Sequence, residues 1–210
     1  MNEELLRFNK DATFLVMDFE TTGLNLFLSK PWQFACVMGK GGKIFEKHNI
    51  FIHWDSLNME KGAEIATRFD MGAWADKAIP TKEAFKTINE KFEEADYIGG
   101  HNLLGYDANI YYSSCERIGV TPYPIHTKIL DTLSFGKGIK LETPYRKGED
   151  VMAYQLRMAS IIVRKRGFAT LSAFADYYDI KFDPDKLHDA LEDVSLNYKV
   201  LMKMIWDIEL

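Results

Sequence analysis

The stretch TFLVMDFETTGL, residues 13–24, ends an apolar run with two acidic residues. The run itself is typical of a buried strand, and Asp18 and Glu20 follow with one Phe between them. Because side chains alternate between the two faces of a strand, Asp18 and Glu20 are predicted to point to the same side at its carboxyl end. Two like charges in that position are unfavourable unless one carboxyl group takes up a proton or a cation lies between them.

The rest of the chain alternates between strand and helix patterns. Two β-like runs at 32–39 and 43–53 are joined by Lys40, Gly41 and Gly42, which is a hairpin signal. Further strands are predicted at 97–100 and 128–135, and the Gly-, Lys- and Pro-rich segment 136–148 is predicted to be a loop. Helical spacing predicts helices at 60–68, at 80–95 with Thr81 as the cap, in the region leading to Gly119, and at about 150–165, 170–178 and 187–207. This order favours an α/β fold, with a mixed sheet flanked by helices.

Size and charge narrow the class of protein. A chain of 210 residues with 47% hydrophobic residues is expected to form one domain, 1–210. Its net charge of −5 argues against a protein that grips nucleic acid by bulk positive charge. The two cysteines lack disulfide or metal spacing, no apolar stretch approaches the length of a membrane span, and the amino terminus is unlike a secretory signal. We therefore expect a cytoplasmic protein with no membrane contact.

Three more residues have chemistry that fits the opening acid pair: Asp107 early in a predicted helix, and His188 and Asp193 in LHDALEDVSLN. On an ideal helix, His188 and Asp193 would lie roughly 140° apart. They can share a site only if Asp193 lies on the helix and His188 lies at or before its first turn. The alternative is a surface ion pair between His188 and Glu192, which are four residues apart.

Taken in order, MDFETTGL, HNLLGYD with DTL further on, and HDALED resemble the three motifs of the DEDDh family of 3′–5′ exonucleases. The resemblance covers about residues 12–205 and implies an RNase H-like fold. In that fold, a five-stranded mixed sheet has three antiparallel strands followed by parallel strands. HNLLGYD is one residue longer than the H-N-x-x-F-D of many members, and this spacing is similar to the exonuclease domains of family-B polymerases.

The resemblance also implies roles for individual residues. Asp18, Glu20, Asp107 and Asp193 become metal ligands, and His188 becomes the general base. We further predict that Asp18 bridges two divalent ions. His101 and Asn102 become substrate contacts. A sister group has Tyr four residues before the last acid, where this chain has Asp189, so the histidine version is indicated.

The chemistry of phosphodiester hydrolysis agrees with this set. Two ions about 3.5–4 Å apart can activate a water, relieve charge on the phosphoryl group and assist the leaving oxygen. All-oxygen ligands suit Mg²⁺ or Mn²⁺. The 3′ end of the substrate is expected to contact backbone groups of Thr21 and Thr22, with Leu24 as an apolar wedge. Phe19 and Tyr106 are lower-ranked aromatic platforms.

The sequence leaves several alternatives open. Single-stranded DNA is favoured as the substrate, with RNA as the alternative, and a polymerase or another replication or repair protein is the kind of partner that the resemblance suggests. Any proofreading would then act in trans. DFETT also resembles the D-x-D-x-T of phosphatases with an aspartyl nucleophile, although Glu20 replaces the second Asp. A third reading is a nucleic-acid-binding module of the same fold without activity.

Overall fold

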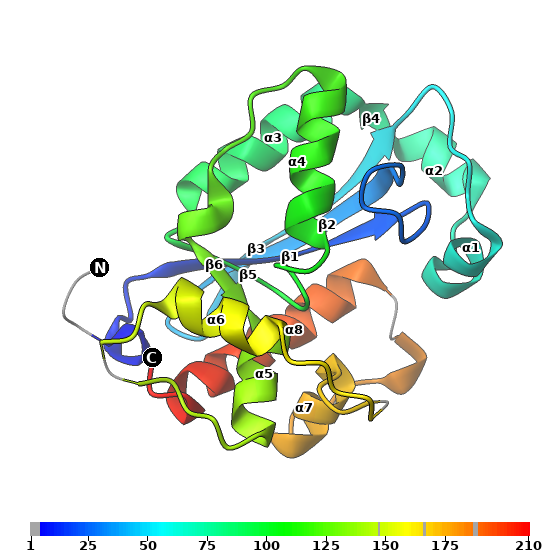
Figure 1. The fold of residues 1–210 in the computed structure, drawn as a ribbon. Helices are drawn as coiled ribbons and strands as arrows, with labels where there is room; N and C mark the ends of the chain where they lie inside the picture. Colours follow the sequence, from blue (N-terminus) through cyan, green and yellow to red (C-terminus); the bar gives the residue numbers. More distant parts are fainter. Residues whose placement is uncertain (1–4, 147, 166, 187–188) are drawn as a thin grey trace.

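The computed structural model describes residues 5–146, 148–165, 167–186 and 189–210. It contains a six-stranded sheet in the order β4-β3-β2-β1-β5-β6 (Figure 1). The three long strands β1, β2 and β3 are antiparallel to one another where they pair, whereas β5 runs parallel to β1 and β6, and β4 runs parallel to β3. The predicted mixed sheet is therefore present.

The strands are β1 (Thr13–Thr21), β2 (Pro31–Lys40), β3 (Lys43–His53), β4 (Ile79–Pro80), β5 (Tyr97–Gly100) and β6 (Ile129–Asp131). The α-helices are α1 (Lys61–Thr67), α2 (Met71–Lys77), α3 (Thr81–Glu94), α4 (Asp107–Ile118), α5 (Thr132–Lys140), α6 (Val151–Ala159), α7 (Leu171–Tyr177) and α8 (Ala190–Asp207). Short 3₁₀ turns lie at Leu6–Phe8, Ile125–Thr127 and Pro184–Lys186.

Two hydrophobic layers cover the two faces of the sheet (Figure 1). Along β1, Phe14 and Val16 pack with α5 to α8, whereas Leu15, Met17 and Phe19 pack with α3 and α4. This alternation is the period of two that a strand imposes on its side chains. Asp18 and Glu20 follow Phe14 and Val16 at intervals of two residues, so β1 directs both acids to the same face, which α8 covers.

Close packing holds α8 against the sheet, where it contacts β1 and β2. A methyl group added at Gly99 of β5 would lie 2.7 Å from Leu201 Cδ2 and 3.0 Å from Val16 Cγ2. At Gly39 of β2, an added methyl group would collide with the ring of Tyr198. The glycines therefore let α8 approach the strands closely, and this approach sets the depth of the residues that α8 carries.

The region after residue 128 differs from the prediction. Strand β6 stops at Asp131, and α5 replaces the end of the predicted strand 128–135 and the start of the predicted loop 136–148. The Asp131 carboxylate caps α5 by accepting from the Leu133 N–H at 3.1 Å and from the Ser134 hydroxyl at 2.8 Å. Gly136 and Gly138 lie inside α5 rather than in a loop, and the rings of Phe174 and Tyr154 occupy the space that a side chain at these positions would need.

Smaller differences have local causes. The sheet has six strands rather than five, because the two-residue β4 adds to the edge at β3. Thr81 is the first residue of α3, not its cap, and its hydroxyl donates to the carbonyl of His53. Helix α2 is absent from the prediction, and α6 ends at Ala159. No helix in the described ranges is both long and apolar enough to cross a bilayer.

The packing of α8 makes a prediction about stability. Gly99→Ala should lower the free energy of unfolding by about 1–3 kcal/mol, because the methyl group crowds Val16 and Leu201. Gly62→Ala is the matched control, because Gly62 lies in the exposed helix α1 with nothing within 4 Å of an added methyl group. It should raise stability by about 0.5–1 kcal/mol. Urea denaturation measures both variants, and equal effects would contradict this role of Gly99.

Candidate active site

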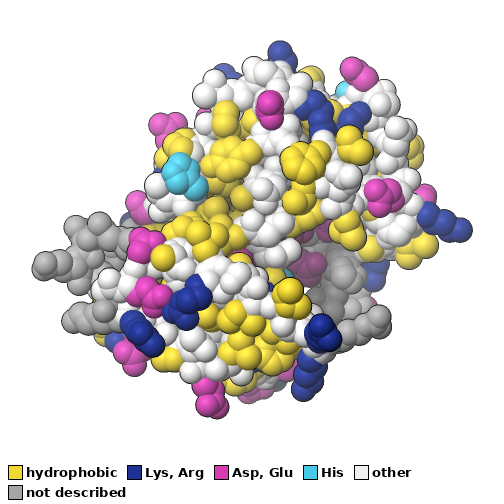
Figure 2. Space-filling view, in the orientation of Figure 1, with side chains coloured by type: hydrophobic (Ala, Val, Ile, Leu, Met, Phe, Trp, Pro, Cys, Tyr) yellow, Lys and Arg dark blue, Asp and Glu magenta, His cyan; other side chains and the backbone are white. Residues whose placement is uncertain are grey.

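Asp18 of β1 and Asp193 of α8 border one cavity. Asp18 and Asp193 line a space of about 170 Å³ together with His101 and Asn197. Its apolar walls are Leu171 of α7 and Val194 of α8. Figure 2 shows acidic side chains within a hollow between the part of the molecule that holds α3 and α4 and the part that holds α5 to α7. Residues from opposite ends of the chain thus border one cavity.

Asp107 reaches the same end of β1 from the other side. Strand β1 continues beyond its partner β5, whose pairing ends at Val16 and Gly99. The N–H group of Phe19 therefore lies beyond the last pair with β5, and it donates to Asp107 Oδ1 at 3.0 Å. Asp107 is the first residue of α4 and is buried, with 3% of its surface exposed. This hydrogen bond fixes the carboxyl group of Asp107 beside the part of β1 that carries Asp18 and Glu20.

Burial and neighbouring negative charges raise the pKa of three carboxyl groups at this end of β1. Burial, and then the charge of Asp193, raises the pKa of Asp18 from 3.8 to about 6. Burial, and then the charges of Asp18, Asp193 and Asp189, raises the pKa of Glu20 from 4.5 to about 8. Burial and the charge of Asp18 also raise the pKa of Asp107 well above its usual range, against the opposing effect of the Phe19 N–H. Negative charge is therefore unfavourable on Asp18, Glu20 and Asp107, and the charge of Asp193 adds to this effect on Asp18 and Glu20.

This environment fits a cation in its chemistry. The candidate ligands are all carboxylate oxygens, which is the donor set that Mg²⁺ and Mn²⁺ prefer. A cation would offset the burial and the repulsion that raise the pKa values of Asp18, Glu20 and Asp107. Among the described residues, however, no group of three or more His, Cys, Asp or Glu side chains is arranged so that it could hold a metal ion. The two-ion site therefore stays a prediction.

The loop after β1 holds the candidate substrate contacts. Thr21 and Thr22 are both buried, and their hydroxyl groups bond within the loop, Thr21 to the Gly23 carbonyl at 2.8 Å and Thr22 to the Lys30 N–H at 3.0 Å. Tyr106 also donates to the Gly23 carbonyl, at 2.5 Å, so it braces this loop. Leu24 is 82% exposed.

The same loop presents two more apolar side chains to solvent, Phe27 and Leu28, although its backbone is well held. Arg117 donates to the Phe27 carbonyl at 2.5 Å, and Ser113 donates to the Leu26 carbonyl at 3.1 Å. Phe19, which the sequence offered as an aromatic platform, lies instead in the core below α3 and α4. It lies between Asp18 and Glu20 on β1, so its side chain points to the opposite face of the sheet.

His101 and Asn102 lie on the turn after β5. The Asn102 N–H donates to Asp131 Oδ1 at 2.9 Å, and Asn102 has a positive φ of 66°. The Nδ1 atom of His101 lies 3.1 Å from the hydroxyl of Thr132. Burial lowers the pKa of His101 from 6.5 to about 4, so its imidazole is neutral at physiological pH. His101 borders the cavity with Asp18, whereas Asn102 is not among the cavity-lining residues.

Sequence reasoning missed two residues of this site. Asn197 lines the cavity and its Oδ1 accepts from the Thr132 hydroxyl at 2.9 Å, which ties α8 to the start of α5. Its position one helical turn after Asp193 is the signal that could have revealed it. Asp131 has no role assigned from its place in DTL, yet it anchors both α5 and the turn of Asn102.

Asp189 fixes where α8 begins. Its Oδ1 accepts from the N–H groups of Leu191 at 3.0 Å and Glu192 at 3.3 Å, so Ala190 is the first helical residue. Asp193 therefore lies on α8, in its first turn. The predicted general base, His188, and its alternative pairing with Glu192 lie outside the described residues.

Comparisons with known proteins identify a family for this chain. Residues 15–201 match the RNase_T family model, which is described as an exonuclease. A PolC-type DNA polymerase III of Listeria welshimeri is 24% identical over 195 residues, which are 90% of this chain and 12% of the polymerase. The PolC-type enzyme of Listeria monocytogenes is 25% identical over 132 residues, or 61% of this chain and 8% of the polymerase.

Solved structures of exonuclease I share the fold. The E. coli enzyme in complex with a dT13 oligonucleotide gives a TM-score of 0.67 at 19% identity, over 92% of this chain and 41% of that protein. Exonuclease I of Methylocaldum szegediense gives 0.66 at 20% identity, over 90% of this chain and 39% of that protein. The chain thus spans well under half the length of each of these relatives, and the structural likeness confirms the predicted RNase H-like fold.

The raised pKa values predict how stability depends on pH without metal. Folded Glu20 keeps a proton that the unfolded chain releases, so its contribution is complete below about pH 4.5 and is lost as pH rises to about 8. In chelator, the unfolding midpoint should therefore fall between these pH values, by at least about 2–4 °C. Glu20→Gln should flatten this slope, while Glu83→Gln on the exposed surface of α3 serves as the control. A slope that is the same in all three proteins would contradict the prediction.

Proposed function

Because this chain belongs to the exonuclease family, we propose that it hydrolyses phosphodiester bonds from the 3′ end of nucleic acid and releases nucleoside 5′-monophosphates. The observation that supports the proposal is that Asp18 and Asp193 border one cavity, with Asp107 held beside the same end of β1. Burial and neighbouring negative charges disfavour the charged forms of Asp18, Glu20 and Asp107 there. Such an arrangement suits a reaction in which bound cations and a phosphodiester occupy the same place.

The four carboxylates would hold two divalent ions, Mg²⁺ or Mn²⁺. When bound, these ions supply charge relief on the phosphoryl oxygens and make a water molecule more acidic. The protein's own contribution is to place the ligands. Asp18 comes from the end of β1, Asp107 is fixed by the Phe19 N–H, and Asp193 is set by the depth of α8 against the sheet.

His188 is the proposed general base. An imidazole with a pKa near 6.5 takes up a proton efficiently close to neutral pH. His101 does not suit this role, because burial lowers its pKa to about 4 and its Nδ1 lies against Thr132. We propose that His101 instead contacts the substrate from the cavity wall, and that Asn102 does so from the adjoining turn.

Single-stranded DNA is the proposed substrate. Leu24 and Phe27 are exposed by more than three-quarters of their surface on a loop whose backbone is held in place, so they can pack against unpaired bases without loss of order in the loop. E. coli exonuclease I has been solved with a dT13 oligonucleotide, which is consistent with this choice. The similarity to PolC-type DNA polymerase III favours a DNA polymerase as the partner, with another replication or repair protein as the alternative.

Degradation of end-labelled strands tests the activity. With 5′-labelled DNA and RNA, with and without a 3′ phosphate, we expect a ladder that shortens from the 3′ end in Mg²⁺ or Mn²⁺, with DNA preferred and no products in chelator. Asp18→Asn and Asp193→Asn should each lower the rate at least about 100-fold, or about 2.7 kcal/mol of transition-state stabilisation. Asp76→Asn, an exposed acid of α2, is the control and should leave the rate unchanged.

The rival functions give other results in the same assay. An aspartyl-nucleophile phosphatase would remove the 3′ phosphate without shortening the strand, and it would show a burst with a phosphorylated Asp18. A nucleic-acid-binding module without activity would leave the strand intact with either Mg²⁺ or Mn²⁺. Either result would contradict the proposed exonuclease.

The pH dependence tests the base separately. Wild-type activity should fall below about pH 6, as His188 becomes protonated. His188→Ala should lower the rate about 100-fold and remove this limb of the profile. His126→Ala, which alters an exposed histidine of the turn Ile125–Thr127, is the control. Normal turnover in His188→Ala would assign the base to another group.

A further inference from the structure

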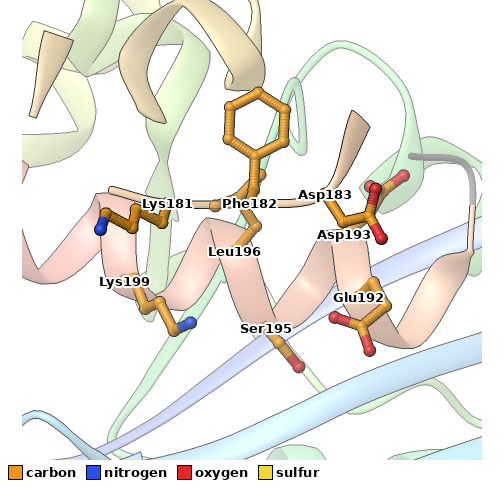
Figure 3. A pocket seen from close by; sticks show the side chains of 8 residues that line it. All are labelled: Lys181, Phe182, Asp183, Glu192, Asp193, Ser195, Leu196 and Lys199. Carbon is orange, nitrogen blue, oxygen red and sulfur yellow. The ribbon is translucent and has the colours of Figure 1, made fainter. Parts of the chain in front are cut away.

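A second cavity is also lined in part by Asp193. It measures about 60 Å³ and is formed between the 181–183 segment and one face of α8 (Figure 3). We call it the lysine groove, because Lys181 and Lys199 form part of its lining. Asp193 borders both this groove and the cavity of the candidate active site. The groove therefore adjoins the place where the proposed hydrolysis occurs.

Charges of opposite sign occupy opposite ends of the lysine groove. Figure 3 shows Lys181 and Lys199 at one end, and Asp183, Glu192 and Asp193 at the other. The acidic end adjoins the proposed metal ligands, where bound cations would offset its charge. The lysine end lies farther from them along α8. A strand of phosphates that leaves the cavity along this groove would pass from the acidic end to the basic end.

A third lysine reaches the groove from the sheet. The ammonium group of Lys47, on β3, donates to the hydroxyl of Ser195 at 3.1 Å. The Ser195 hydroxyl gives its own proton to the Leu191 carbonyl at 2.6 Å, so its oxygen is an acceptor for Lys47. This bond holds the Lys47 ammonium beside the lining of the groove, because Ser195 forms part of that lining.

These lysines carry positive charge that the described part of the protein does not pair. Among the described residues, none of Lys47, Lys181 and Lys199 forms an ion pair with a carboxylate. The chain as a whole has a net charge of −5, so three such lysines around one groove are not explained by a generally basic surface. Ammonium groups on flexible stems are well suited to phosphate as point charges.

We propose that Lys47, Lys181 and Lys199 form a phosphate-binding subsite for the nucleic acid strand, one or more nucleotides away from the bond that is cut. The proposal rests on the proposed function for its substrate class. The subsite gives an acidic protein a local hold on a polyanion, and it sets the strand against the carboxylates without a base-specific contact.

Binding in chelator tests the subsite without hydrolysis. The probe is a 5′-fluorescein-labelled oligo(dT), and its anisotropy is followed between about 50 and 200 mM salt. The double variant Lys47→Gln/Lys199→Gln should bind about tenfold more weakly at low salt. Its slope of log K against log salt should be shallower by about 0.7 for each phosphate that is no longer neutralised. Lys181→Gln alone should shift both quantities in the same direction.

The matched control is Lys82→Gln/Lys86→Gln, which removes the same charge from the exposed side of α3, on the opposite face of the sheet. It should leave the salt slope unchanged. Equal slopes and affinities in the two double variants would overturn the subsite. Unfolding midpoints of all variants, measured in parallel, separate weaker phosphate binding from a less stable fold.

A small substrate separates the subsite from the chemistry. The p-nitrophenyl ester of thymidine 5′-monophosphate has one phosphodiester and no neighbouring nucleotides, so the groove variants should hydrolyse it at the wild-type rate while their KM for oligo(dT) rises. An equal decrease on both substrates would overturn the subsite. If wild-type protein hydrolyses neither substrate in Mg²⁺ or Mn²⁺, the proposed function fails, whereas the anisotropy measurement still decides the groove.

Discussion

Desolvation and mutual repulsion of the carboxyl groups at the end of β1 are the constraint around which the molecule is arranged. Asp18 and Glu20 lie two residues apart on one face of a strand, Asp107 is held by the N–H of Phe19, and the charge of Asp193 acts on both acids of β1. Each raised pKa means that ionisation of the group lowers the stability of the folded state relative to the unfolded chain. The hydrophobic layers on both sides of the sheet must offset that cost, because no lysine or arginine among the described residues forms an ion pair with Asp18, Glu20 or Asp107.

The position of α8 determines whether the site exists. Its contacts with β1 and β2 depend on the absence of side chains at Gly39 and Gly99, so the helix lies close enough for Asp193 to border the same cavity as Asp18. Its start is fixed by the cap at Asp189, and Asn197 ties it to Thr132. A helix of the same sequence packed farther from the sheet would carry the same acids to a different place. The site therefore depends on the close approach of α8 to the sheet as well as on the chemistry of the side chains that α8 carries.

Asp131 has a comparable role on the other side of the cavity. Its buried carboxylate accepts hydrogen bonds from the Asn102 N–H, from the first turn of α5 and from the Ser134 hydroxyl. Asp131, the last residue of β6, therefore holds both the start of α5 and the turn that carries His101. Burial raises the pKa of Asp131, and these hydrogen bonds oppose the rise because they favour its charged form. Asp131 thus shows that an acid near the site can be structural, and that residue type alone does not identify a metal ligand.

The sequence by itself determined the long strands, the face on which Asp18 and Glu20 lie, the amphipathic helix α3 and the family, because these depend on local periodicity and on motif order. It missed the helical start at Thr132 and the helical glycines of α5, because Asp131 acts as a cap only through contacts with Ser134 and the turn at Asn102, and because Phe174 and Tyr154 come from other helices. Only the tertiary structure decided that Asn197 borders the same cavity as Asp18 and Asp193 and that Lys47 reaches the groove beside it. The reason is physical: the depth of α8 is set by packing between residues far apart in the chain, and no local pattern records that distance.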